Sequence, residues 1–178
     1  MFGRKKETSE QKPFQLIILT TEYLIEGTAN GEQQYYLPVS QEYWSPIVLE
    51  DVRITSVNDS KVPVRKAKTF EVLGNTVVAL IPLKDASSMS QFESYASWDE
   101  EMEGTFYIGP YIFEGTLMNV GNDYFSAALN MVDVSITHAN PNTPFEKIQA
   151  ENVLVNTFWI HGREIKDGWQ FKENSRLG

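Results

Sequence analysis

The chain has 178 residues, of which 42% are hydrophobic and 12% aromatic, with a formal net charge of −9 at pH 7 and no cysteine. This composition supports a packed interior and excludes disorder throughout the chain, while the lack of cysteine excludes disulfides, thiolate metal sites and cysteine nucleophiles. No apolar run reaches the ~18 residues of a membrane-spanning helix and the basic start leads into no signal-peptide core, so we expect a cytoplasmic protein without membrane contact.

Acidic residues are concentrated near the middle of the chain. Residues 84–103 hold one basic and six acidic side chains, more than half of the net charge. Such a segment is typical of a solvated linker or a partner-facing surface. We therefore divide the chain into a flexible N-terminal segment (1–13), a first β unit (14–83), an acidic linker (84–103), a second β unit (104–166) and a C-terminal tail (167–178).

The first unit has the composition and periodicity of β-strands. Residues 14–29 are rich in β-branched and aromatic side chains. Residues 49–57 alternate between apolar and polar, and this alternation places Leu49, Val52 and Ile54 on the inward face once one small irregularity is allowed.

Residues 62–83 predict a β-hairpin with its turn at Leu73-Gly74-Asn75. Pro82 is expected to end the second strand or to place it at a sheet edge, because proline cannot donate to a ladder. No stretch of ten or more residues has the i, i+3, i+4, i+7 apolar spacing of a helix. Helix is therefore expected only in short pieces, around residues 85–98 and 144–147.

The two β units match each other in sequence. Gly27 and Gly115 occupy matching mid-strand positions, which predicts strong bending or close backbone approach at both. The collinear order of the matches predicts an internal duplication, and a repeat of roughly sixty to seventy residues suits a small barrel. The matching segments are Glu22–Thr28 with Pro110–Thr116, Asp51–Thr55 with Asp133–Thr137, and Asn75–Val78 with Asn156–Trp159.

Short motifs in both units resemble those of a known family. A hydrophobic pair followed by glycine occurs at Ile112–Leu117, and a Leu-x-x-Val strand follows at Leu129–Val134. The first unit offers Leu24–Ala29 and Ile47–Val52 at the same places, and Trp159–Ile165 contains Ile-His-Gly-x-x-Ile. These segments resemble the two signatures of the Sm-like (LSm) family.

The resemblance implies an all-β fold of two tandem, strongly bent, five-stranded Sm-like barrels with little helix. It also implies pairing of edge strands between neighbouring barrels. We therefore expect a homo-oligomer, for example a trimer whose six barrels form a ring.

RNA-binding members of this family use an Asp and an Asn in the turn of the first signature and the Arg-Gly of the second. The resemblance therefore makes Asp123, His161, Gly162 and Arg163 candidate nucleic-acid-binding residues. The Asn of the turn is missing and His161 replaces the Arg, and these two side chains hold a base edge and a phosphate. Their loss, together with the acidic charge, disfavours RNA binding.

Aromatic residues gather in two segments. Tyr43 and Trp44 lie in a loop of the first unit, and Phe92, Tyr95 and Trp98 recur every third residue in the acidic linker. One interpretation is that they close the open ends of the barrels. The other is a protein-interaction surface, because aromatic side chains dominate interface hot spots.

Catalytic motifs are missing from the sequence. It contains no Gly-x-Ser-x-Gly elbow and no phosphate-binding glycine loop. His138 is most simply a hydrogen-bonded loop residue. His138 and His161 are far apart in the sequence, so the pair makes a poor zinc site. The carboxylates of Asp99–Glu103 are most simply those of a solvated linker. The basic group reads most simply as a solvated strand face and consists of Arg53, Lys61, Arg65, Lys66 and Lys68.

We therefore predict no enzyme activity, no cofactor and no metal. The leading hypothesis is a non-catalytic β-barrel scaffold or adaptor that self-associates or binds another protein. The alternatives are an Sm-like RNA-binding protein that uses a non-standard surface, and a protein that binds a small ligand between its two barrels.

Overall fold

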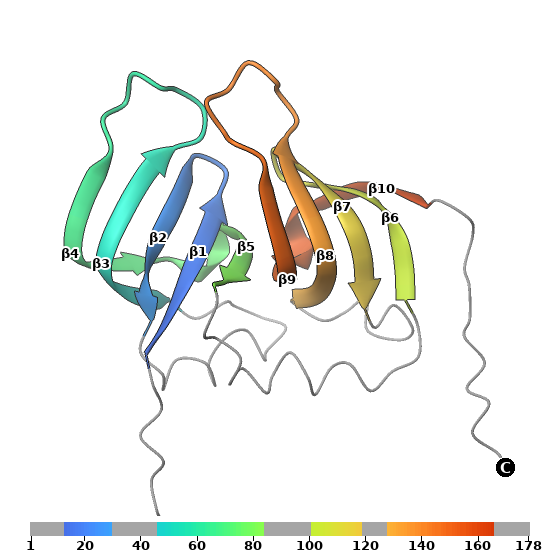
Figure 1. Cartoon of the computed structure of the whole chain (residues 1–178), viewed down its shortest axis with the longest axis horizontal. Coiled ribbons are helices and arrows are strands. Elements are labelled where there is room, and N and C mark those ends of the chain that lie inside the picture. Colours follow the sequence, from blue (N-terminus) through green and yellow to red (C-terminus); the bar gives the residue numbers. More distant parts are fainter. Residues whose placement is uncertain (1–12, 30–45, 84–100, 119–127, 166–178) are drawn as a thin grey trace, which may run out of the picture.

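The structure is a computed structural model that describes residues 13–29, 46–83, 101–118 and 128–165. These residues form strands and two short 3-10 segments (Figure 1). The strands are β1 (Phe14–Thr20), β2 (Tyr23–Ala29), β3 (Ile47–Ser56), β4 (Arg65–Val72), β5 (Val77–Pro82), β6 (Glu101–Ile108), β7 (Tyr111–Met118), β8 (Ala128–His138), β9 (Ile148–Asn156) and β10 (Ile160–Ile165), and the 3-10 segments are η2 (Gly74–Thr76) and η5 (Thr157–Trp159).

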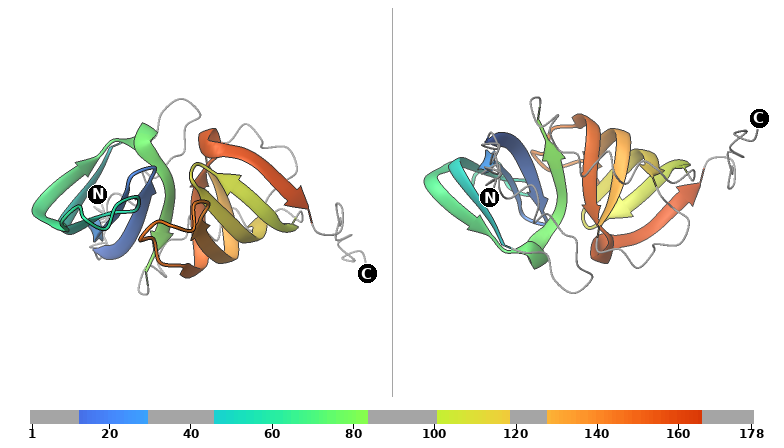
Figure 2. Two further views of the ribbon diagram at one scale, coloured as in Figure 1. Left: turned by 90° about the horizontal axis from the view of Figure 1, so that it is seen from above. Right: turned by 90° about the horizontal axis from the view of Figure 1, so that it is seen from below.

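All ten strands belong to one antiparallel sheet that is not closed, in the order β10-β6-β7-β8-β9-β5-β1-β2-β3-β4. The predicted all-β class is therefore confirmed, but the strands form one continuous sheet where the sequence predicted two barrels. Figure 2 shows that the sheet curls into two curved halves side by side, the first half (β1–β5) and the second half (β6–β10). Within the described ranges no helix is long and apolar enough to cross a membrane.

The predicted hairpin at residues 62–83 is wrong. β4 pairs only with β3 in this sheet, whereas β5 pairs with β1 and β9. The 3-10 segment η2 separates the two strands, and its Thr76 N–H and hydroxyl both donate to the Leu73 carbonyl. Burial explains the different positions: Val77–Ile81 is buried throughout and suits a central strand, while β4 is mostly exposed. Pro82 ends β5, as predicted.

The short helices expected from the sequence are not found where the structure can test them. Residues 144–147 form a bend and an irregular loop that leads into β9. Residues 85–98 lie outside the described ranges. The second half begins with β6 at Glu101, so the end of the predicted acidic linker is already part of the sheet.

The two halves have the same strand order and the same irregularities. β2 and β3 shift register around Gly27, and β7 and β8 shift around Gly115. The extra residue of each bulge has a positive φ, 51° at Asp51 and 53° at Asp133. Asp51 is therefore the irregularity that the alternation of residues 49–57 requires. A bulge bends its strand and increases the local twist, which produces the curl of each half.

Close backbone approach at both glycines is confirmed. A Cβ atom on Gly27 would lie 3.0 Å from the Cβ of Leu49. On Gly115 it would lie 3.0 Å from the carbonyl oxygen of Val132 and 3.1 Å from that of Asp133. Only glycine lets the bulged strand pass this closely without displacing the neighbouring backbone.

The third sequence match is out of step with the structure. The sequence aligns Asn75 with Asn156, but the cross-strand partners counted from the two bulges place Leu73 at the position of Asn156. The same register superimposes η2 on η5. The shared Asn-Thr dipeptide therefore does not mark equivalent positions, because the hydrogen-bond ladder, not local similarity, fixes which residues correspond.

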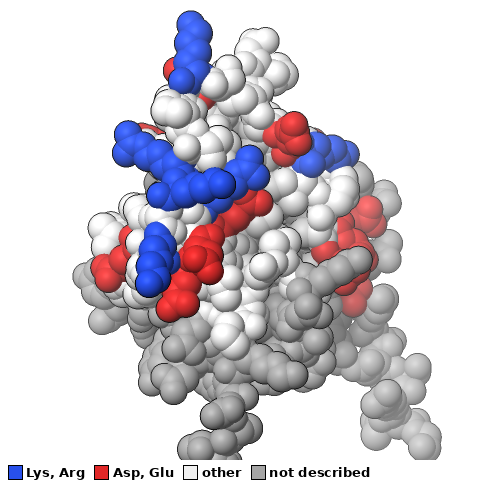
Figure 3. Space-filling model, turned by 60° about the vertical axis from the view of Figure 1, so that its left-hand side comes forward, with Lys and Arg blue, Asp and Glu red and all other residues white. Residues whose placement is uncertain are grey.

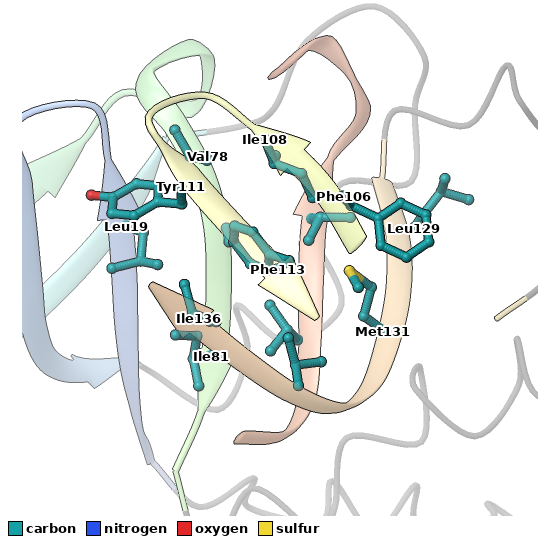
Figure 4. Packing of buried hydrophobic residues seen from close by; sticks show 14 of the residues in the cluster. Leu19, Val78, Ile81, Phe106, Ile108, Tyr111, Phe113, Leu129, Met131 and Ile136 are labelled. Carbon is teal, nitrogen blue, oxygen red and sulfur yellow. The ribbon is translucent and has the colours of Figure 1, made fainter. Parts of the chain in front are cut away.

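Buried apolar side chains form two clusters. Leu49 and Val52 are buried as predicted, while Ile54 is half-buried and packs against the same cluster. The larger cluster fills the second half and also includes buried residues of the first half (Figure 4). Those first-half members are Leu19, Val57, Val78, Ala79 and Ile81. Apolar packing therefore continues from one half of the sheet into the other.

Gly115→Ala should lower the free energy of unfolding by ~1–3 kcal/mol, because the added methyl group meets backbone atoms that cannot rotate away. Urea denaturation followed by circular dichroism measures this change. Gly162→Ala is the matched control, since a Cβ there meets nothing within 4 Å. Equal stability of the two variants would contradict the close-approach role of Gly115.

Candidate functional site

The two halves meet where β5 pairs with β9, a contact that we call the junction. Ala79 lies opposite Val155 and Leu80 lies opposite Leu154 in antiparallel register. All four residues are buried. Leu80 and Leu154 belong to the same first-half cluster, so a strand of the second half contributes directly to the core of the first half.

Apolar side chains from both halves pack around Tyr111, the first residue of β7. Tyr111 is fully buried, and Figure 4 shows its ring beside Leu19 and close to Val78. Gly109, in the turn before β7, also faces the Val78 side chain. Packed side chains therefore fill the contact between the halves around Tyr111. This is the region in which the small-ligand alternative expects a binding site.

Two buried side-chain hydrogen bonds cross the junction. The Tyr111 hydroxyl donates to the Thr20 carbonyl oxygen at 2.6 Å. The Asn156 amide donates to the Val77 carbonyl oxygen at 2.8 Å, and its own side-chain oxygen accepts from the Phe158 N–H. Because these carbonyls are shielded from water, losing either side-chain donor costs a buried hydrogen bond.

His138 and Phe145 surround the Tyr111 ring. The His138 ring meets it edge-on with centroids 5.4 Å apart, and the Phe145 ring is tilted with centroids 5.1 Å away. The Asn140 N–H donates to Nδ1 of His138 at 3.1 Å. The predicted hydrogen bond of His138 within this segment is therefore confirmed, but His138 is the last residue of β8 and pairs with Tyr111, and so is not a loop residue.

β4 and β10 are the two outer strands of the sheet. Within the described ranges β4 pairs only with β3, and β10 only with β6. Each outer strand therefore has one edge without a ladder partner in this part of the chain, and such an edge is a template for pairing with another strand.

Three of the nucleic-acid candidates lie on β10. His161 and Arg163 are exposed, Gly162 is half-buried, and Arg163 donates to the Met102 sulfur at 3.6 Å. The next residue, Glu164, accepts a hydrogen bond from Tyr107 at 2.8 Å, and this bond raises the pKa of the tyrosine. The fourth candidate, Asp123, lies outside the described ranges. The three described candidates therefore share one outer strand of the sheet.

The aromatic interaction candidates lie outside the described ranges. They are Tyr43, Trp44, Phe92, Tyr95 and Trp98. Both of their interpretations remain predictions.

The basic group lies in and around β3 and β4, where Lys and Arg alternate with Asp and Glu on the surface (Figure 3). All five of its side chains are exposed. Arg53 lies 3.5 Å from Glu26 in a surface ion pair. This arrangement agrees with a solvated strand face. Among the described residues no group of three or more His, Asp or Glu could hold a metal ion.

Comparison with protein-family models, curated proteins and solved structures finds no match for this chain.

Sequence reasoning missed the residues that hold the junction together. Tyr111 and Tyr23 both lie in the matched segments, yet they served only as evidence of repetition. The fact that tyrosine occurs at both positions was the available signal. Thr20 and Asn156 gave no signal, because Thr20 accepts through its backbone carbonyl and Asn156 donates to a backbone carbonyl of the other half.

Tyr111→Phe should cost ~1–3 kcal/mol of unfolding free energy, because it leaves the Thr20 carbonyl without its buried donor. Tyr107→Phe is the control: it removes an exposed hydrogen bond to Glu164 and should cost below ~1 kcal/mol. Chemical denaturation of both variants measures the difference, and similar losses would contradict the role of the Tyr111 bond.

Stability should also fall at alkaline pH because of Tyr111. Burial raises the pKa of its hydroxyl above the ordinary value of 10.0, so the folded state keeps a proton that the unfolded state releases. The free energy of unfolding therefore decreases as the pH rises above about 10. Denaturation at about pH 8 and about pH 10.5 should show a smaller decrease for Tyr111→Phe than for the parent protein. Identical pH slopes would contradict this assignment.

Proposed function

We propose that this protein is a non-catalytic β scaffold that self-associates through its two outer strands. β4 of one copy pairs with β10 of the next. In this proposal the halves are tandem Sm-like units related by duplication, and three chains close a ring of six units.

The junction is the observation that carries the proposal. Each half has the same strand order, so β5 and β10 are equivalent outer strands at one end of a half, and β4 and β9 at the other. Inside the chain, β5 of the first half already pairs with β9 of the second. The two strands at the ends of the sheet are β10, the equivalent of β5, and β4, the equivalent of β9. A second copy can therefore repeat outside the chain the contact that exists within it.

Such a contact is head-to-tail, because it joins different surfaces of the two copies. Head-to-tail contacts produce closed rings when the rotation closes and open filaments when it does not. The strong curl of each half favours closure. The sequence resemblance to a family whose barrels associate by edge strands supports the same arrangement.

Light scattering after size exclusion tests the proposal. We expect a single species of three times the chain mass of 20.3 kDa at two loading concentrations. A monomer at both concentrations would overturn self-association. A mass that increases without limit as the concentration rises would retain edge pairing but reject the closed ring.

RNA binding should be absent in this protein. The described nucleic-acid candidates lie on β10, the strand that association covers, and the chain carries a net charge of −9. We expect no shift of labelled oligo-U in a gel at low ionic strength, where phosphate contacts are strongest. A shift that disappears as salt is added would instead support the RNA-binding alternative.

A further inference from the structure

Every residue of the junction has a counterpart at the open edges, because the strand register repeats in the two halves. Tyr23 starts β2 as Tyr111 starts β7. Thr20 ends β1 as Ile108 ends β6. Two further pairs are Glu71 with Leu154 and Arg163 with Leu80. These correspondences state which side chains would meet if a second copy repeated the junction.

In the part of the chain that the structure describes, no other half packs over Tyr23. The side chain is 40% exposed, whereas its counterpart Tyr111 is 0% exposed and bonded to the Thr20 carbonyl. The counterpart of that acceptor is the carbonyl of Ile108 at the β6–β7 turn. A second copy seated as in the junction therefore places its β6–β7 turn over Tyr23.

Most of the exposed large apolar side chains in the described ranges lie in the first half. Of the five large hydrophobic residues that are exposed in the described ranges, only Phe158 belongs to the second half. The other four lie at the start of β2, in the β3–β4 loop and just after β4. They are Tyr23, Val62, Val64 and Leu73. In the second half the corresponding β8–β9 loop packs Phe145 on Tyr111, and Asn156, the counterpart of Leu73, is buried.

The central cross-strand pair at the open edges is ionic. At the junction Leu80 lies opposite Leu154. Their counterparts on β10 and β4 are Arg163 and Glu71, both exposed and of opposite charge. Arg163 lies over the end of the second-half core, where it contacts the Met102 sulfur. Opposite charges directly across an antiparallel ladder stabilise the pairing and fix its register.

A second pair of opposite charges lies diagonally across the same two edges. Exposed basic side chains dominate β4, namely Arg65, Lys66 and Lys68. On β10 the exposed Glu164 lies beside Arg163, and the neighbouring strand β6 carries exposed Glu101 and Glu103. In the register of the junction Glu164 is diagonal to Lys68, within reach of a long side chain. Complementary edges of this kind favour head-to-tail docking and oppose pairing of two identical edges.

We propose that a second copy of this chain docks its β10 and β6–β7 turn on β4 and Tyr23, in the register that sets Arg163 opposite Glu71 and the Tyr23 hydroxyl on the Ile108 carbonyl. This inference rests on the self-association proposed above. It adds a defined register, an ionic pair and a buried tyrosine that is exposed in the single chain.

Charge reversal in the full-length protein tests the ionic pair. Glu71→Arg and Arg163→Glu should each weaken association about tenfold, because like charges then lie opposite each other. The double variant E71R/R163E should restore association to within about threefold of the parent. Glu114→Arg, an exposed reversal in the middle of the second half, is the matched control and should leave association unchanged. Sedimentation equilibrium measures all four. Failure of the double variant to recover would overturn the pairing.

Disulfide trapping tests the register independently, because the chain has no cysteine of its own. With Glu71→Cys and Arg163→Cys in one chain, oxidation should link neighbouring copies into a ladder on a non-reducing gel. Thr69→Cys with Arg163→Cys shifts the pair by two residues, to a diagonal distance of ~7–8 Å that a disulfide does not span. More linking by the shifted pair than by the aligned pair would reject this register.

Tyr23→Phe tests the hydroxyl. It should weaken association about fivefold while leaving the unfolding midpoint of the dissociated chain unchanged, since the side chain is partly exposed there. An unchanged association constant would reject the proposed bond to Ile108. The two proposals fail separately: a parent protein that is a monomer overturns self-association, whereas an oligomer that ignores all these variants overturns only the register.

Discussion

The architecture depends on the position of β5 between β1 and β9. This strand completes the ladder of the first half and also supplies the edge on which the second half pairs. Its uninterrupted apolar run, Val77–Ile81, is stable only if both faces are covered. Covering them requires the second half to be present, so the two halves form one sheet with a shared apolar contact. The Tyr111 and Asn156 hydrogen bonds then fix the orientation of the halves.

The sequence predicted what local pattern controls. The all-β class follows from residue composition, and the bulge at Asp51 follows from a break in alternation beside a glycine that tolerates close approach. The hairpin at residues 62–83 was wrong because adjacency in sequence does not decide which strand β5 pairs with. The Asn75 alignment was wrong for a related reason: a shared dipeptide carries less information than a ladder of cross-strand partners.

The candidate site could be predicted only in part. The segment around Arg163 resembles a signature in sequence, but its place on an outer strand is visible only in the sheet order. Tyr23 was visible as half of a repeated pair. Its significance depends on the contrast between an exposed and a buried copy of the same residue, and burial is a tertiary property.

The junction between β5 and β9 also limits how many halves a closed assembly can hold. Because each chain already contains one such contact, any closed assembly made by adding β4–β10 contacts holds an even number of halves, and the two kinds of contact alternate around it. A single substitution therefore alters every second contact and leaves the others as they were. Separate single halves could form a closed assembly with an odd number of halves. Two halves joined in one chain cannot.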